Sequence, residues 1–284
     1  MSSRSAPQLV EVIRQQLGLQ LSPPRWQWFT KAIDTMTESD SPLTTWEQAS
    51  TSAIHHIGKA PFSAKLALPT TTVLSAPKKP QAWTPQHWHC TDAVRILLCH
   101  AAQQAAGCEE DKQGDTLLAG YKRGDENERA ALIKGLQLLD PKGKNAALAI
   151  EACRINSLNL FTAIALFNPY PAIFFSQDAF NQLVIKSLFQ GLNISFIYGL
   201  EARRNHNLSI MALRYIEERL DANRPVPDSI WLAIDCLNMT ERCQRLFDSI
   251  IGDDTHHALM TAKQALQQSQ CEQQCRDETF EASH

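Results

Sequence analysis

The chain has 284 residues, of which 44% are hydrophobic and 20% are charged, and its formal net charge at pH 7 is −3. Binding to nucleic acid usually requires a clustered basic surface, so we expect no nucleic-acid partner. The nearest candidate for a membrane span, Leu158 to Phe175, is interrupted by two asparagines and two prolines, which argues against one. The amino terminus lacks the apolar core of a signal peptide, so we expect a cytoplasmic protein.

Signals for the start and end of helices recur along the first half of the chain. Ser22-Pro23, Ser41-Pro42 and Thr84-Pro85 each place a capping residue before a proline, as in the first turn of a helix. Asp125 and Glu128 have the spacing of a capping box, and Asp140-Pro141 should end the helix that this box begins.

The second half continues the helical pattern. After the Pro225–Pro227 turn comes a short apolar segment, and Thr240 should cap a further helix. We therefore predict an all-α fold of roughly a dozen helices in a compact multi-helix array. Successive helix pairs could stack in a HEAT-like, α-superhelical manner, although no fixed repeat period is visible. One helix carries an apolar stripe at i, i+3, i+4, i+7 and i+8, namely Leu208, Met211, Ala212, Tyr215 and Ile216.

Residues 59–86 form the longest section without helical signals and are the best candidate for a domain boundary. Prolines near both ends of this section and the pair Lys78-Lys79 predict a surface loop. We therefore expect an N-terminal helical segment over 1–58, a loop over 59–86, a main helical domain over 87–266 and a polar, frayed tail over 267–284.

Histidines and cysteines gather between residues 87 and 108, but their spacing does not predict a metal site. His87 falls on a different face from His89 and His100 on what the pattern presents as one helix, and no C-x₂₋₄-C or H-x₃₋₅-H pair occurs between residues 87 and 108. The eight cysteines of the chain are scattered without a CxxC pair, so we expect them to be reduced. We predict no metal and no cofactor, and we leave the role of this region open.

Charged and amide side chains occur at helical spacing inside otherwise apolar helices between residues 138 and 206. A buried charge must be paired or hydrogen-bonded, because desolvating it alone is costly. These side chains therefore either converge on a polar ligand site or lock the helices together in a buried network, and both interpretations stay open. The candidate ligand-binding residues are Asn145, Glu151, Arg154, Asn168, Tyr170, Asn181, Lys186, Glu201, Arg203 and Arg204.

This segment, with LDPKGKNAALAIEACR followed by FNPYPA, FNQLV and RPVP, resembles the EboA family of bacterial proteins over about residues 135–235. The resemblance implies a cytoplasmic helical accessory protein encoded beside enzymes such as a prenyltransferase and a metal hydrolase. In cyanobacteria, such gene clusters are associated with export of the precursor of the pigment scytonemin. The family has no settled catalytic residues, so the resemblance implies a pathway and no mechanism.

We therefore expect an accessory protein in the biosynthesis or export of a small secondary metabolite, such as a prenylated or otherwise lipophilic one. It would bind an intermediate, or a partner enzyme encoded in the same gene cluster, and basic side chains would meet an anionic group. One alternative is a lyase-like or transferase-like enzyme with Glu151 as its base beside the basic cluster. Another is a pure scaffold whose polar network is structural. The sequence leaves open whether the protein catalyses a reaction.

Overall fold

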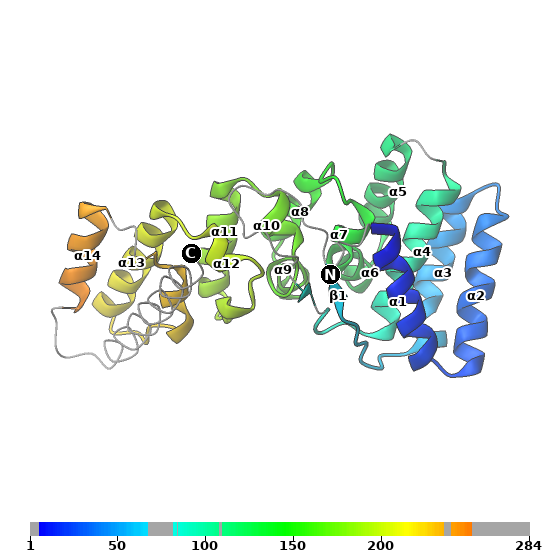
Figure 1. The fold of residues 1–284 in the computed structure, drawn as a ribbon, viewed down its shortest axis with the longest axis horizontal. Coiled ribbons are helices and arrows are strands. Elements are labelled where there is room, and N and C mark those ends of the chain that lie inside the picture. The colour runs from blue at the N-terminus through cyan, green and yellow to red at the C-terminus, as the bar shows by residue number, and fades with distance from the viewer. Residues whose placement is uncertain (1–5, 68–81, 84, 108–109, 236–239, 252–284) are drawn as a thin grey trace, which may run out of the picture. The chain divides into compact units, whose positions relative to one another are not determined.

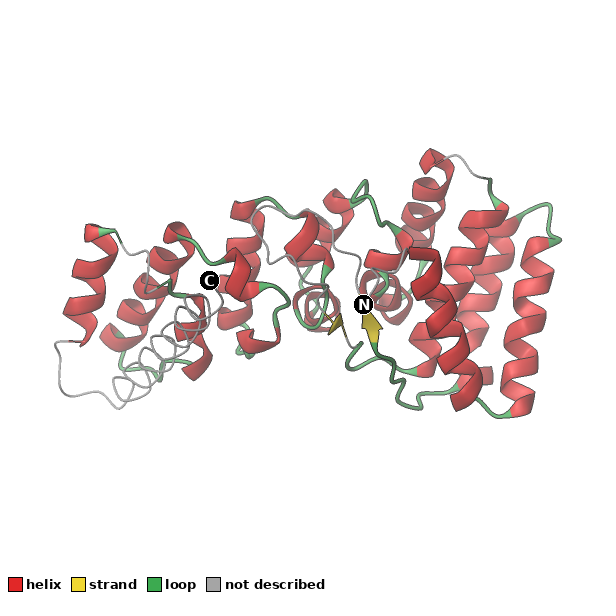
Figure 2. Cartoon of the chain, viewed as in Figure 1, coloured by secondary structure: helices red, strands yellow, loops and turns green. Residues whose placement is uncertain are grey.

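The computed structural model describes residues 6–67, 82–83, 85–107, 110–235 and 240–251, and nearly all regular structure among them is helical (Figures 1 and 2). The predicted all-α fold is confirmed. The chain divides into two compact units after Ser176. The loop section 59–86 lies inside the first unit, and the predicted main domain 87–266 spans the division.

The first unit is arranged around one central helix, α4, which packs against α1, α2, α3, α5, α6 and α7. All residues from Thr91 to Cys99 are buried, as expected for a helix surrounded on every side. The elements of the first unit are α1 (Ala6–Gln20), α2 (Pro23–Thr37), α3 (Pro42–Ile57), β1 (Leu66–Ala67), β2 (Ala82–Trp83), α4 (Cys90–Ala105), α5 (Glu110–Arg123), α6 (Glu126–Lys134), α7 (Leu136–Leu139), α8 (Ala146–Arg154), α9 (Leu158–Ala165) and α10 (Tyr170–Phe174).

The second unit is built around α13, which contacts α11, α14 and the 3₁₀ helix η2. Four of the five residues in the stripe predicted for α13 are buried, and the fifth, Met211, is half-buried. The elements of this unit are α11 (Gln177–Phe189), η1 (Ile194–Phe196), α12 (Leu200–Arg203), α13 (His206–Asp221), η2 (Asp228–Ala233) and α14 (Glu241–Ile251).

Most of the predicted helix starts are confirmed. The helices α2 and α3 begin at the prolines that follow Ser22 and Ser41. The capping box before α6 forms in both directions: the backbone N–H of Glu128 donates to Asp125 Oδ1 at 2.7 Å, and that of Asp125 donates to Glu128 Oε2 at 2.9 Å. Thr240 lies directly before α14, as predicted, and its Oγ1 accepts from the backbone N–H of Cys243 at 3.4 Å.

The helix start expected at Thr84-Pro85 is wrong. Thr84 lies outside the described residues, and α4 begins only at Cys90, after a capping box between His89 and Asp92. His87 has a φ of 61°, which interrupts any right-handed helix, and His89 forms an isolated antiparallel bridge with Pro61. His87 and His89 therefore precede the helix on which their spacing had placed them.

The described part of the predicted loop, residues 59–67, 82–83 and 85–86, contains no helix, as expected. Two-residue strands from its ends pair antiparallel, with Leu66 opposite Trp83. This pairing brings Trp83 and the segment that follows it toward the helices of the first unit. No helix among the described residues is both long and apolar enough to cross a membrane.

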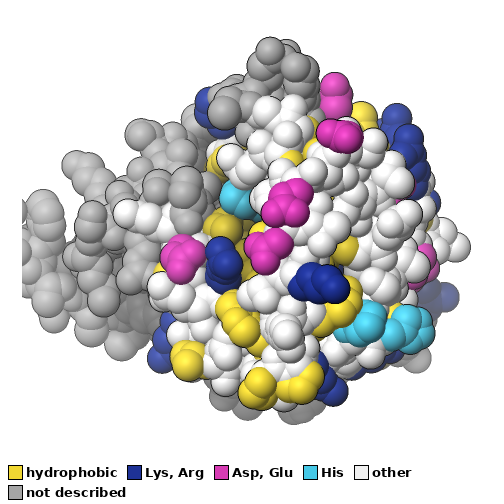
Figure 3. Space-filling model, turned by 90° about the vertical axis from the view of Figure 1, so that its right-hand side faces the viewer, with side chains coloured by type: hydrophobic (Ala, Val, Ile, Leu, Met, Phe, Trp, Pro, Cys, Tyr) yellow, Lys and Arg dark blue, Asp and Glu magenta, His cyan; other side chains and the backbone are white. Residues whose placement is uncertain are grey.

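Figure 3 shows the face of the first unit that includes α2. Both basic and acidic side chains are exposed there, together with hydrophobic side chains.

Candidate functional site

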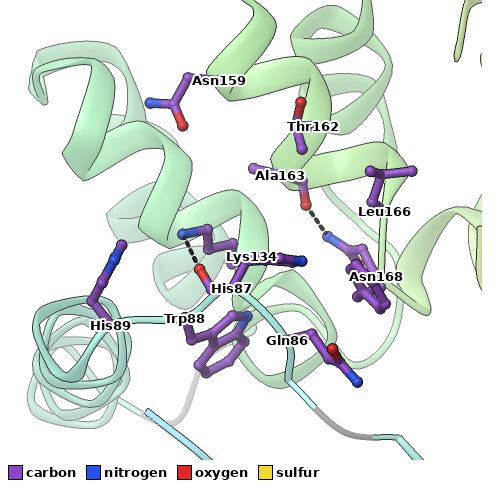
Figure 4. Close-up of a pocket in the computed structure, with 11 residues that line it drawn as sticks. Gln86, His87, Trp88, His89, Lys134, Asn159, Thr162, Ala163, Leu166 and Asn168 are labelled. Carbon is purple, nitrogen blue, oxygen red and sulfur yellow. Dashed lines mark hydrogen bonds between the residues drawn. The ribbon is translucent and has the colours of Figure 1, made fainter. Parts of the chain in front are cut away.

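A cavity of about 270 Å³ lies in the first unit, between the segment that leads into α4, the end of α6 and one face of α9 (Figure 4). The helix α9 contributes Asn159, Thr162 and Ala163, at i, i+3 and i+4, which share one face. The lining residues are Gln86, His87, Trp88, His89, Lys134, Asn159, Thr162, Ala163, Leu166, Phe167 and Asn168.

Two residues at this cavity have an unusual backbone conformation. His87 and Phe167 have φ values of 61° and 54°, in the left-handed region that residues other than glycine rarely adopt. The carbonyl of each is held by a hydrogen bond: Lys134 Nζ donates to His87 O at 3.1 Å, and Trp83 Nε1 donates to Phe167 O at 2.8 Å. The rings of His87 and Phe167 lie 5.2 Å apart, tilted by 50°. Backbone strain that the surrounding structure maintains in this way is typical of functional sites.

Lys134 carries the positive charge of the cavity. Its Nζ donates to Asp92 Oδ2 at 2.7 Å as well as to His87 O. The same carboxylate oxygen accepts the backbone N–H of His89 at 2.8 Å, and it lies 3.5 Å from His89 Nδ1. A lysine ammonium has three N–H donors, so one remains for an acceptor in the cavity. The lysine side chain is 17% exposed, which limits screening by water.

Aromatic rings form the apolar side of the cavity. Trp88 is 4% exposed and lies between Trp83, at 5.8 Å in an edge-on arrangement, and Phe62, at 6.1 Å in a stacked one. Leu166 and Phe167, which directly follow α9, also line the cavity. The cavity therefore combines apolar and aromatic walls with a few polar groups, as small-molecule sites do.

Among the residues predicted from the sequence to bind ligand, Asn168 alone lines this cavity. Its amide already has partners, because Nδ2 donates to Ile133 O at 3.0 Å and to Ala163 O at 2.9 Å. Its Oδ1 accepts the backbone N–H of Tyr170 at 3.0 Å. Asn168 therefore fixes the end of α9 against α6, and holds the neighbouring Phe167 in place.

The other four predicted residues of the first unit do not gather at one point. Tyr170 is fully buried, and its hydroxyl donates to Asp140 Oδ2 at 2.6 Å, an oxygen that also accepts the backbone N–H of Asn145 at 2.6 Å. Glu151 and Arg154 are exposed on α8, because that helix packs on α9 through its opposite, alanine-rich face.

Five predicted residues fall in the second unit, and the structure brings two of them together. Asn181 exchanges side-chain hydrogen bonds with Asn205 at 2.9 and 3.2 Å. Gln177 Nε2 donates to Asn181 Oδ1 at 3.0 Å and to the carbonyl of Arg203 at 2.9 Å. The Arg203 guanidinium lies 4.7 Å from the centre of the Phe180 ring, and burial lowers its pKa.

The remaining three residues of that unit are more accessible. Lys186 and Arg204 are half-buried, and Glu201 is exposed. The ten predicted residues thus divide equally between the two units, and their convergence on one ligand stays a prediction. Among the described residues, no group of three or more histidines, cysteines, aspartates or glutamates lies close enough to hold a metal ion.

Sequence reasoning did not select most of the residues that line the cavity. The segment AWTPQHWHC, residues 82–90, is dense in aromatic and histidine residues, and this density is the one signal that could have indicated a site. Lys134 gave no signal, because it lies 47 positions from His87 and reads as an ordinary basic residue at a helix end.

Removing the Tyr170 hydroxyl is expected to destabilise the first unit by about 1.5–3 kcal/mol, since a buried carboxylate loses a charge-assisted hydrogen bond. Burial, reinforced by the bond to Asp140, raises the pKa of Tyr170 far above its usual value. The unfolded chain ionises near pH 10 while the folded chain keeps its proton, so stability falls as pH rises above about 10. Urea unfolding at several alkaline pH values should show that the free energy of unfolding falls less steeply with pH in Tyr170→Phe than in the wild type. An unchanged slope would contradict the role given to this hydroxyl.

A family model described as metabolite traffic protein EboA matches residues 9–235. The match includes every residue that lines the cavity and all ten residues predicted from the sequence. No curated protein and no solved structure matches the chain.

Proposed function

This chain belongs to the EboA family, and we propose that it serves metabolite traffic by binding a small molecule in the cavity of its first unit. The bound molecule would be an intermediate in the biosynthesis or export of a secondary metabolite. The protein would hold this intermediate for, or pass it to, enzymes encoded beside its gene.

One observation carries the proposal: two residues other than glycine are kept in the left-handed region on the rim of a cavity, and each is anchored through its carbonyl. Such conformations cost on the order of 1–3 kcal/mol each and persist only where the surrounding structure enforces them. The consequence here is that the rings of His87 and Phe167 meet at the cavity. Preorganised rings of this kind favour binding, because little side-chain freedom is lost when a ligand arrives.

The composition of the wall favours binding over catalysis. Trp88, Leu166 and Phe167 suit a lipophilic molecule, and no carboxylate or thiol is among the described residues that line the cavity. Glu151, the base that an enzyme would need under the alternative drawn from the sequence, is exposed on α8 and is not part of this wall. An accessory role is therefore better supported than a lyase-like or transferase-like one.

The proposal is tested by filling the cavity. Thr162→Trp adds an indole to a half-buried position on the lining face of α9, whereas Leu158→Trp adds the same group to a position on α9 that is 55% exposed. Both proteins would be purified from a host that carries the neighbouring genes and examined by native mass spectrometry. We expect a small molecule to accompany the wild type and Leu158→Trp and to be lost from Thr162→Trp.

A molecule retained equally by both variants would contradict the proposed site. Circular dichroism and urea unfolding provide the control that Thr162→Trp is folded, since overpacking by itself costs typically about 1–3 kcal/mol. The mass of the accompanying molecule would also identify the class of metabolite.

A scaffold that docks partner enzymes is the second candidate function. Phe189, Phe196 and Leu232 are large apolar side chains of the second unit that are 61%, 45% and 40% exposed. They lie on α11, η1 and η2, and η1 packs against each of the other two. Apolar side chains concentrated on neighbouring elements are typical of protein interaction sites. An empty protein that co-purifies with a second chain in the experiment above would favour this function.

A further inference from the structure

The charge on the wall of the cavity has one sign. Among the described residues that line it, Lys134 is the one lysine or arginine, and none is an aspartate or glutamate. Its partner Asp92 is 7% exposed and is not a lining residue, so the carboxylate lies behind the ammonium. A molecule in the cavity therefore meets the cation first.

Asp92 does not fully neutralise Lys134, because the negative charge of Asp92 is shared with other positive groups. The carboxylate occupies the first turn of the 16-residue helix α4 and accepts the backbone N–H of His89 in a capping box. The positive end of the helix dipole and this N–H both interact favourably with the negative charge of Asp92. Lys134 consequently keeps a positive field toward the cavity, together with the N–H donor that is not used by Asp92 or His87.

We propose that the cavity selects molecules that join an apolar body to an anionic group, with Lys134 as the residue that determines this specificity. The inference rests on the proposed function and specifies its ligand class. The anionic group, such as a carboxylate, sulfonate or phosphate, accepts from Lys134 Nζ. The apolar body packs against Trp88, Leu166 and Phe167, which all line the cavity.

Two dyes with the same rings separate the charge from the apolar body. 8-Anilinonaphthalene-1-sulfonate carries a sulfonate, and N-phenyl-1-naphthylamine is the same ring system without it. Both become fluorescent in apolar sites, so the dissociation constant of each can be titrated on the full chain. We expect the sulfonate dye to bind about tenfold or more tightly than the neutral dye, and its binding to weaken as salt is added.

Variants of Lys134 and Asp92 give opposite expectations. Removing the lysine alone would leave Asp92 buried without its partner and could unfold the protein, so Lys134→Met is combined with Asp92→Asn. The double variant should lose about tenfold or more in affinity for the sulfonate dye and keep its affinity for the neutral dye. Asp92→Asn alone leaves the ammonium without its counter-charge, so the sulfonate dye should bind several-fold more tightly.

Each contrary result shows whether the inference alone or also the proposed function is wrong. Equal affinities of the two dyes in the wild type, or equal losses for both in the double variant, would overturn the inference and leave the proposed site intact. If neither dye binds, or if Thr162→Trp leaves both affinities unchanged, the proposed function fails and the inference fails with it.

Discussion

Replacing Glu128 with alanine is expected to lower the free energy of unfolding of the first unit by about 3–5 kcal/mol, because the buried Arg95 loses its counter-charge. The Arg95 side chain is 5% exposed, and one of its terminal nitrogens lies 3.9 Å from Glu128 Oε1. That oxygen also accepts from Ser50 Oγ at 3.2 Å and from Thr51 Oγ1 at 3.0 Å. The other carboxylate oxygen caps α6. The substitution therefore removes a helix cap and leaves a buried guanidinium without its anion.

Glu47→Ala is the matched control. Glu47 Oε1 is 2.8 Å from Arg123, a closer ion pair than that of Glu128, but the arginine side chain is 61% exposed. Exposed pairs are worth about 0–1 kcal/mol, since water and salt screen them. Five of the six tryptophans lie in the first unit, so urea unfolding followed by tryptophan fluorescence reports mainly on it. Equal losses in the two variants would contradict the role of burial.

Gly143→Ala is expected to destabilise the first unit by about 2–5 kcal/mol, from two separate causes. Gly143 has a φ of 73°, a conformation that alanine adopts at a cost. An added Cβ would also lie 2.2 Å from Cδ1 of Phe174, far inside contact distance. The Phe174 ring cannot withdraw freely, because it packs against the Tyr170 ring with centroids 4.7 Å apart.

Two comparisons separate these causes. Gly191 has a similar φ of 71° but nothing within 4 Å of an added Cβ, so Gly191→Ala should show the backbone cost alone, about 1–2 kcal/mol. In a double-mutant cycle, Phe174→Ala should remove much of the penalty of Gly143→Ala, because the clash disappears. Strictly additive effects in urea unfolding would contradict the steric account.

The buried polar residues predicted from the sequence are mostly used to hold the fold. Asn168 ties α9 to α6, Tyr170 satisfies Asp140, and Asn181 joins α11 to the residue before α13. Every one of these contacts follows from the requirement that buried polar groups be hydrogen-bonded. The requirement predicts that each buried polar group has a hydrogen-bond partner. A ligand is only one of the partners that can meet it.

The choice between a buried and an exposed face of a helix could not be made from α8 alone. The helix has nine residues, and apolar or alanine side chains occupy most of its circumference. Leu148, Ala149 and Ala152 are buried, which places Glu151 and Arg154 on the solvent side. Packing against α9 decides this orientation, because no strong apolar stripe within α8 does.

The sequence by itself determined the features that depend on neighbours along the chain. The helix starts after Ser22 and Ser41 follow from the proline at the first helical position, and the start after Asp125 follows from its capping box. The all-α class follows from the periodicity of apolar residues. Only the tertiary structure decided where the cavity lies. His87, Lys134 and Phe167 are tens of residues apart, and long-range hydrogen bonds from Lys134 and Trp83 impose the left-handed conformations that make His87 and Phe167 meet. Contacts of that range leave no local pattern in a single sequence.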